Sequence, residues 1–202
     1  MTALADQVVE LGASLFARRI TSGRTGNISV RDGDRVLLTP TGVSLGALDE
    51  LSVLSADGEH LSGPAPTKEA FLHLAMYRAR PGASAVVHTH STHSVAVSCM
   101  AGLDPGDVLP PLTAYYAMRV GALPLVPYHA PGDASLGALA EEMAREHHAL
   151  LLANHGPIAA GGDLAAAADA VEEIEETARI FLLLRNTATT PLTPGQVAAL
   201  RR

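Results

Sequence analysis

Apolar residues at helical spacing predict a helix near each end of the chain. Leu4, Val8, Leu11 and Leu15 recur every three or four residues, as on the buried face of an amphipathic helix. Asp163 is expected to cap a second, longer helix. The apolar face of that helix comprises Leu164, Ala167, Ala168, Val171, Ile174, Ala178 and Leu182. Both helices should therefore pack one face against a core.

Shorter apolar runs between these helices predict strands. The runs cover residues 35–38, 85–90, 123–128 and 149–153. Turn signatures occur at Pro40-Thr41-Gly42 and at Asp57-Gly58, the second of which is typical of a hairpin. Thr67 is expected to cap a helix, and the segment 23–29 is expected to be a polar loop. Further helices are expected over residues 92–100 and 138–147.

The interleaving of strands and helices predicts the fold class. It favours a single α/β domain over residues 1–202, with a central, mainly antiparallel or mixed sheet flanked by helices in three layers. The pattern contains no internal repeat and no clear linker. The segment 187–202, with its prolines and terminal arginines, is expected to be a peripheral tail.

Composition excludes several classes of function. The formal net charge is −7 and the basic residues form no stripe, so a nucleic-acid surface is not expected. Cys99 is the only cysteine, which rules out an internal disulfide. The apolar runs are shorter than the roughly 20 residues of a membrane span, and the N-terminus lacks the features of a signal peptide. A cytoplasmic protein without membrane partners is expected.

Three histidines at predicted strand ends suggest a metal site. His88 and His90 lie two residues apart, and side chains at that spacing share one face of a strand. Such a pair alone is also common among core residues. His155 follows a second predicted strand, and three histidines resemble a catalytic zinc site with a further position open or filled by a carboxylate. Imidazole ligands favour Zn²⁺, with iron, cobalt or manganese as alternatives.

Glu69 is the candidate carboxylate. It stands near the start of a predicted helix, where a carboxylate also simply complements the helix dipole. His93 follows the metal strand and could support a ligand. The remaining histidines are expected to have structural roles: His60, His73, His129, His147 and His148.

Five segments together resemble the class II aldolase/adducin family. They are Thr25-Gly26-Asn27-Ile28-Ser29, Thr39-Pro40-Thr41-Gly42, Pro66-Thr67-Lys68-Glu69, His88-Thr89-His90 and Asn154-His155-Gly156. They occur in the family's order and at compatible spacing, over residues 4–185. Each segment alone is a modest signal, but the ordered set is specific.

The resemblance implies a fold, an assembly and a set of site residues. The fold is a nine-stranded sheet flanked by helices, and the assembly is a cyclic homotetramer with active sites between neighbouring subunits. His88, His90 and His155 would be zinc ligands, with Glu69 as acid/base residue and fourth ligand. The substrate phosphate would be held by Gly26, Asn27, Thr41, Gly42, Thr67 and Lys68. Backbone N–H groups at glycines and at a helix start suit an anion of this kind.

One departure from the aldolase pattern indicates a branch of the family. Aldolases and epimerases of this family usually have two serines before the acidic residue, where this chain has Thr67 and Lys68. The segments 66–73, 91–98 and 109–113 look most like the 3-oxo-tetronate 4-phosphate decarboxylase branch. Epimerases also tend to have aspartate at the position of Glu69.

The expected activity is that of a zinc-dependent carbon–carbon lyase. A 3-oxo-tetronate 4-phosphate would lose CO₂ through a metal-bound enediolate, which Glu69 would protonate to give dihydroxyacetone phosphate. The alternative is a class II sugar-phosphate aldolase, whose departing alkoxide would need an acid such as Tyr115 or Tyr116. Further alternatives are a pentulose-phosphate 4-epimerase and a non-catalytic adducin-like scaffold, against which the retained histidines argue.

Overall fold

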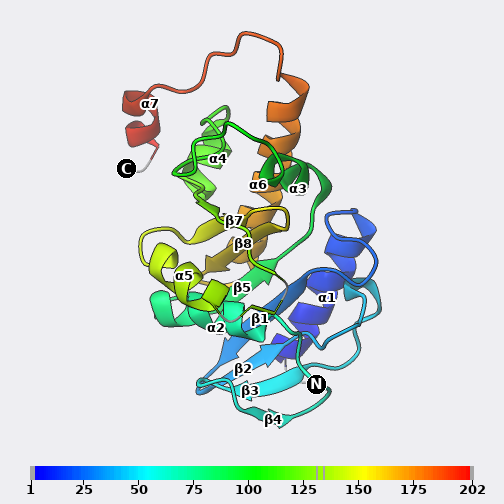
Figure 1. Ribbon diagram of the computed structural model, residues 1–202. Helices are drawn as coiled ribbons and strands as arrows, with labels where there is room; N and C mark the ends of the chain where they lie inside the picture. The colour runs from blue at the N-terminus through cyan, green and yellow to red at the C-terminus, as the bar shows by residue number, and fades with distance from the viewer. Residues whose placement is uncertain (1–2, 131, 134, 201–202) are drawn as a thin grey trace.

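The computed structural model describes residues 3–130, 132–133 and 135–200. Its described strands form one eight-stranded sheet in the order β4-β3-β2-β1-β5-β8-β7-β6 (Figure 1). The strands are β1 (Asn27–Asp32), β2 (Arg35–Leu38), β3 (Ser52–Ser55), β4 (His60–Ser62), β5 (Ala85–His88), β6 (Leu125–Val126), β7 (Ala149–Leu152) and β8 (Gly156–Gly161). All neighbours pair antiparallel except β6 and β7, which are parallel. The predicted mixed sheet is confirmed.

The expected count of nine strands is wrong for the described residues. Pro40 and Pro66 meet only as an isolated bridge. Proline has no N–H to donate to a strand ladder, so the pairing at this point does not extend into a further strand.

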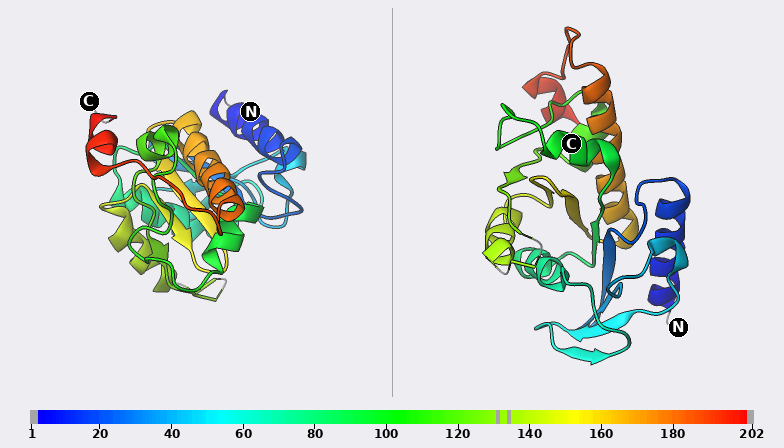
Figure 2. Two further views of the ribbon diagram at one scale, coloured as in Figure 1. Left: turned by 90° about the horizontal axis from the view of Figure 1, so that it is seen from above. Right: turned by 45° about the vertical axis from the view of Figure 1, so that its right-hand side comes forward.

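Helices cover both faces of the sheet, which confirms the three-layer expectation. They are α1 (Ala3–Ala17), α2 (Ala70–Ala79), α3 (Thr92–Ser98), α4 (Ala114–Arg119), α5 (Ser135–Ala144), α6 (Leu164–Leu183) and α7 (Pro194–Ala199), with a 3₁₀ turn, η1, at Leu45–Ala47. Figure 2 shows α2 and α5 on one side of the sheet and α1 and α6 on the other. None of the helices in the described part of the chain is long and apolar enough to cross a membrane.

Alternation along the central strands divides the core in two. Ala85 and Val87 of β5 belong to the core beneath α1 and α6, whereas Val86 belongs to the core beneath α2 and α5. Ile28 and Val30 of β1 also face the α1 side. Because strand side chains alternate between faces, the polar residues between them on β1 face α2.

Several boundaries differ from the sequence prediction. The last three residues of the expected loop 23–29 belong to strand β1. Polar residues in this strand obscure the alternation of apolar and polar positions that predicts a strand. Strand 85–90 ends at His88, and strand 123–128 shrinks to two residues between Pro124 and Pro127. Strand β8 and helix α4 were not predicted. The helix expected to be capped by Thr67 begins at Ala70, with Glu69 as N-cap and no side-chain capping bond.

The segment after α6 lies at the edge of the molecule, as Figure 1 shows for α7. α7 contributes no buried residue. It contacts α4, and the backbone N–H of Leu192 donates to the Pro111 carbonyl at 2.9 Å. The described part of the expected tail is thus a short helix tethered to the domain surface.

Glu175 of α6 fixes the start of α3. Its Oε1 accepts from the backbone N–H of His93 at 3.0 Å and from His93 Nδ1 at 2.7 Å. Its Oε2 accepts from the N–H and the hydroxyl of Ser94 at 2.8 and 2.7 Å. Burial would raise the pKa of Glu175, but these hydrogen bonds outweigh burial and lower it. His93 is therefore bonded to α6, next to the turn that carries His90.

Glu175→Gln should lower the free energy of unfolding at neutral pH by roughly 1–3 kcal/mol, because an amide NH₂ would face N–H donors. The lowered pKa means that the carboxylate contributes stability above its ordinary pKa of 4.5, and that this contribution is lost as the pH falls through the folded-state pKa. The difference between wild type and variant should therefore shrink as the pH falls below 4.5 and through the folded-state pKa. Urea denaturation at neutral and at acidic pH measures it.

Glu176→Gln is the matched control, because Glu176 is exposed on the same helix and forms an exposed ion pair with Arg179 at 3.4 Å. It should change stability little at either pH. A stability difference for Glu175→Gln that is equal at both pH values would contradict the assigned role of its charge.

Candidate metal centre

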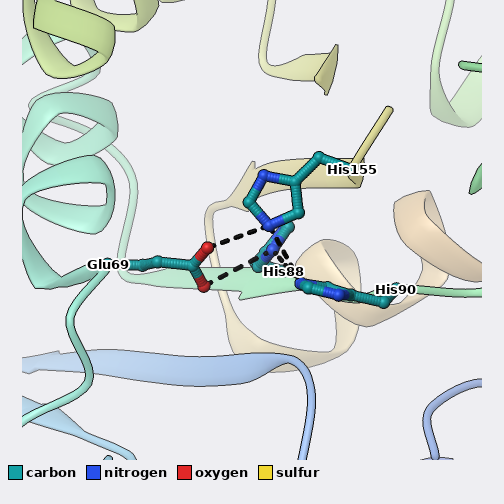
Figure 3. Close-up of side chains that lie close together, drawn as sticks. All are labelled: Glu69, His88, His90 and His155. Atoms are coloured by element: carbon teal, nitrogen blue, oxygen red, sulfur yellow. Dashed lines mark hydrogen bonds and ion pairs between the residues drawn. The ribbon is translucent and has the colours of Figure 1, made fainter. Parts of the chain in front are cut away.

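Four side chains converge on one point, as Figure 3 shows. Glu69, His88, His90 and His155 each offer a ligand atom within 4.8 Å of the others. His90 Nε2 lies 3.0 Å from His88 Nε2 and 3.0 Å from His155 Nε2. Glu69 Oε1 lies 2.9 Å from His155 Nε2, and Oε2 lies 3.6 Å from His88 Nε2. Ligands bonded to a tetrahedral zinc at ~2.0–2.1 Å would be about 3.3 Å apart, so the cluster is the right size for one ion.

The sheet positions the three histidines. His88 is the last residue of β5, and His90 follows two residues later, just before α3. His155 lies in the tight turn between β7 and β8. That turn needs Gly156, because its φ is 153° and a Cβ there would lie 2.2 Å from the Thr89 carbonyl oxygen. A glycine therefore lets the third histidine approach the other two.

The Nε2 atoms of His88 and His90 face the centre of the cluster. His88 donates from Nδ1 to the Pro157 carbonyl at 2.8 Å, which leaves its Nε2 lone pair for a ligand. Burial lowers the pKa of His88. Burial, with the neighbouring His88 and His155, lowers the pKa of His90 to about 3. Neutral imidazole is the form that binds a metal, so these two rings are prepared for a cation at neutral pH.

Glu69 is held as a carboxylate. Asn27 Nδ2 donates to Glu69 Oε2 at 2.6 Å. Burial alone would raise the pKa of Glu69, but the proximity of His88 and the hydrogen bonds from His155 and Asn27 outweigh it and hold the pKa well below its ordinary value. The cluster thus combines three nitrogen ligands with one anionic oxygen, a donor set that fits a divalent transition metal.

The segments expected to hold phosphate lie beside Glu69. The N–H of Thr67 donates to the Thr39 carbonyl at 3.3 Å, and the N–H of Thr41 donates to the Ala65 carbonyl at 3.0 Å. These bonds bring the Thr41–Gly42 turn alongside Thr67 and Lys68.

Gly26 adjoins the same region through β1. Its φ is +79°, and a Cβ there would lie 2.9 Å from the His88 carbonyl oxygen. Thr41, Gly42 and Lys68 are exposed, so they present open surface to a ligand.

Asn27 has a different environment from the one expected. Its side chain is buried, and Nδ2 donates both to Glu69 and to Thr67 Oγ1, the latter at 3.3 Å. Its Oδ1 accepts from His73 Nε2. The amide is therefore committed to protein groups, and a phosphate role for Asn27 would have to use its backbone.

A cavity of about 540 Å³ lies next to the cluster. Its lining includes His90 and His155 on one side and Tyr128 and His129 on another. Small-molecule sites typically measure ~300–1,000 Å³. The cluster therefore borders a space large enough for a small substrate.

The two adjacent tyrosines have opposite environments. Tyr116 is fully buried, and burial raises its pKa. Its hydroxyl has no partner among the described residues. Tyr115 is 61% exposed on α4, where the Arg119 guanidinium lies 5.2 Å from its ring centroid. Tyr115 is not in the lining of the cavity beside His90, so this chain alone does not bring it to the cluster.

Sequence reasoning missed three buried residues behind Glu69. They are Ser29, His73 and Tyr77, which are linked by hydrogen bonds to one another and to Asn27. His73 had been assigned a purely structural role. The available signal was the spacing of Glu69, His73 and Tyr77, which recur every four residues on one helix face.

Comparisons with known proteins show the family of the chain. The family model of the Class II Aldolase and Adducin N-terminal domain matches residues 6–182. A 3-oxo-tetronate 4-phosphate decarboxylase of Escherichia coli is 46% identical over 202 residues, covering 98% of this chain and 95% of the relative. An L-fuculose phosphate aldolase of Methanocaldococcus jannaschii is 36% identical over 180 residues, covering 88% of this chain and 94% of the relative.

A solved structure supports the same relationship. The crystal structure of YgbL, a putative aldolase/epimerase/decarboxylase from Escherichia coli, aligns with a TM-score of 0.96 at 44% identity, covering 99% of this chain and 98% of that chain. With the sequence match, the three-layer fold and the cluster in agreement, the chain belongs to the class II aldolase and adducin family.

Proposed function

We propose that this protein is a metal-dependent carbon–carbon lyase that decarboxylates a 3-oxo-tetronate 4-phosphate. The observation that carries the proposal is the cluster of three histidines and Glu69 beside exposed, phosphate-compatible turns. Similarity over nearly the whole chain to the Escherichia coli decarboxylase supplies the substrate class. The fuculose phosphate aldolase relative is less similar.

The proposed metal ligands are His88, His90, His155 and, in the resting site, Glu69. Zn²⁺ is the proposed ion, since three imidazoles and a carboxylate suit its tetrahedral preference. When bound, a divalent metal supplies Lewis-acid stabilisation of negative charge on a substrate oxygen. Other divalent transition metals share these ligands.

The reaction needs a sink for electrons and a source of one proton. The bond between C1 and C2 of the β-keto acid breaks, CO₂ leaves, and the electron pair moves into the C2–C3–oxygen system as an enediolate. Glu69, which is a carboxylate in the structure, would take up one proton from solvent and deliver it to C2, which gives dihydroxyacetone phosphate. Glu69 suits this role because its Oε1 faces the histidine cluster while its Oε2 is anchored by Asn27.

The phosphate site is proposed at the turns beside Glu69. Backbone groups at Gly26, Asn27, Thr41 and Gly42 and the Thr67–Lys68 pair would bind the anion there. Lys68 is the only lysine in the chain, and it is exposed next to Glu69. An ammonium there would contact either the phosphate or the carboxylate of a doubly anionic substrate.

An aldolase is the second candidate. The same cluster would serve retro-aldol cleavage, and the aldolase relative supports this alternative. That reaction needs an acid for the departing alkoxide, and Tyr115 is the exposed tyrosine of the pair. In a homotetramer with sites between subunits, Tyr115 would come from a neighbouring copy. The tetramer, the cytoplasmic location and the absence of nucleic-acid and membrane partners remain predictions.

Removal of a histidine should abolish metal binding. His88→Ala, His90→Ala and His155→Ala should each lose the one tightly held divalent ion per chain, because each deletes an inward-facing nitrogen. Elemental analysis of purified protein measures it. His60→Ala is the control, since His60 is exposed on β4 and bonds only locally to the Ser62 carbonyl at 3.0 Å. Full metal content in all three cluster variants would refute the site.

Glu69→Gln should lose most of the turnover. Removal of a positioned acid/base residue typically costs ~10²–10⁴-fold in rate, and the loss should fall on kcat more than on KM. Steady-state CO₂ release measures it, with Glu59→Gln as a control at an exposed turn. If Glu69→Gln retains metal and near-normal kcat, another group delivers the proton.

Lys68→Ser should weaken catalytic efficiency by roughly ten- to a hundredfold, the size of a lost charge-assisted contact. Kinetics on a 3-oxo-tetronate 4-phosphate and on an aldol substrate without a carboxylate show where the ammonium acts. A loss confined to the β-keto acid would place it at the carboxylate and support the decarboxylase. An equal loss on both would place it at the phosphate.

Arg185→Ser, which removes one exposed charge near the end of the long helix, controls for net charge. If Lys68→Ser matches this control on both substrates, Lys68 has no substrate role. Rapid turnover of the aldol substrate with no CO₂ from any 3-oxo-tetronate 4-phosphate would instead establish the aldolase.

A further inference from the structure

We infer that Tyr77, Ser29 and His73 are positioning residues, which form a buried chain of hydrogen bonds that fixes the amide of Asn27 with its NH₂ group towards Glu69. The chain lies outside the four-residue cluster and runs away from it, between α2 and β1. The inference deepens the proposed function and rests on it in one respect, which is that Glu69 is the reacting carboxylate.

Two regular spacings create the chain. Glu69, His73 and Tyr77 recur every four residues and so share one face of the start and body of α2. Asn27 and Ser29 lie two residues apart on β1 and so share one face of the sheet. The helix face meets the strand face, and polar groups pair where apolar residues would otherwise pack.

The distances define a continuous path. The Tyr77 hydroxyl lies 2.9 Å from Ser29 Oγ, which lies 2.7 Å from His73 Nδ1. His73 Nε2 bonds to Asn27 Oδ1, and Asn27 Nδ2 lies 2.6 Å from Glu69 Oε2. The first four side chains are at most 4% exposed, so bulk water does not substitute for their partners.

The direction of every bond follows from the carboxylate. An ionised Glu69 can only accept, so Asn27 must present its NH₂ group there and its carbonyl oxygen to His73. His73 must therefore carry its proton on Nε2. The ring is fully buried, and its other nitrogen, Nδ1, lies 2.7 Å from Ser29 Oγ, so a neutral ring offers Nδ1 there as an acceptor. Ser29 then donates to Nδ1 and accepts from the Tyr77 hydroxyl.

Two contacts therefore fix the orientation of the Asn27 amide, one with Glu69 and one with His73. If the amide turned over, its oxygen would face the Glu69 carboxylate and its NH₂ would face the N–H of His73. Both contacts would be repulsive, and a buried group without a partner costs free energy. With Oε2 held by Asn27, the carboxylate plane of Glu69 directs Oε1 towards His155, at 2.9 Å.

A purely structural role is the competing explanation. In that case the bonds would simply join α2 to β1, and their loss would lower stability without selecting one orientation of Asn27. The two explanations differ in two measurable respects. A positioning role requires one tautomer of His73, and it requires kcat to fall when the hydrogen-bond donor at the Nε2 position is removed.

The first test reads the tautomer directly. In ¹⁵N-histidine-labelled, metal-free protein at neutral pH, the two-bond ¹⁵N–¹H spectrum should show His73 as a neutral ring protonated at Nε2. Ser29→Ala removes the donor to Nδ1 and should leave this tautomer in place, because Asn27 Oδ1 still accepts from Nε2. A His73 that is protonated at Nδ1, or charged, would overturn the inference. This readout needs no substrate, so it stands apart from any failure of the proposed reaction.

The second test separates positioning from stability. His73→Leu should lower kcat by about tenfold or more, the size of one lost charge-assisted contact, with KM and metal content little changed. His73→Gln places an amide N–H near the position of Nε2 and should recover much of that loss. Tyr77→Phe, which deletes only the hydroxyl at the far end, should give a smaller fall. His60→Gln, on exposed β4, is the control.

The outcomes decide the inference. If His73→Leu and His73→Gln lose kcat equally, or if neither loses it, the donor at Nε2 does not position Glu69. If His73→Leu does not fold, kcat of Ser29→Ala and of Tyr77→Phe is compared with the wild-type value instead. An unchanged kcat in both variants would overturn the inference. Normal turnover in Glu69→Gln would refute the acid role of Glu69 while leaving the tautomer result intact.

Discussion

The pairing of β5 with β1 on one side and β8 on the other holds the whole site together. In this register Asn27 lies opposite His88, and β8 begins beside the same strand end. Gly26 and Gly156 allow the flanking strands to come this close, because a Cβ at either would meet the backbone of His88 or Thr89. The four cluster residues come from distant parts of the sequence, so the cluster exists only when the sheet has formed.

The same pairing imposes an electrostatic cost on the protein without its ion. Burial favours neutral rings at His88 and His90, and neutral rings point lone pairs at one another over 3.0 Å. Glu69 adds a negative charge to this group. A cation at the centre would convert these repulsions into bonds. Metal binding should therefore be coupled to the stability of the folded sheet, as is general where ligands converge only on folding.

The sequence revealed the elements whose apolar pattern is intact and missed β1 and β8, the two strands that flank β5. The amphipathic helices α1 and α6 and the apolar strands β5 and β7 were predicted correctly, apart from their ends. Strand β1 was taken for a loop because Asn27 and Ser29 occupy the positions that face α2. Strand β8 was missed because it opens with Gly156 and Pro157, residues that usually mark turns.

Prediction of strands and helices from apolar periodicity therefore fails where polar side chains of a site occupy positions that are usually apolar. The four cluster residues were still predicted, because strand-end spacing and the family resemblance point to them without knowledge of β1. His73 and Tyr77 were not, since their partners on β1 were not known to face them. The spacing of polar residues on a helix indicates a buried network only when the strand residues that face them are also known.

The residues of the site fall into two groups, those held inside the fold and those on exposed turns. This division suggests how one fold can serve related reactions. The network behind Glu69 is buried and the cluster is buried or half-buried, and both are held by strands and a helix. Thr41, Gly42 and Lys68 lie on exposed turns, where a substitution disturbs no core. Substitutions there can therefore occur while the four cluster residues stay in place. The Thr67–Lys68 pair, which departs from the two serines of the aldolase pattern, is thus where a decarboxylase of this family can diverge without rebuilding its metal centre.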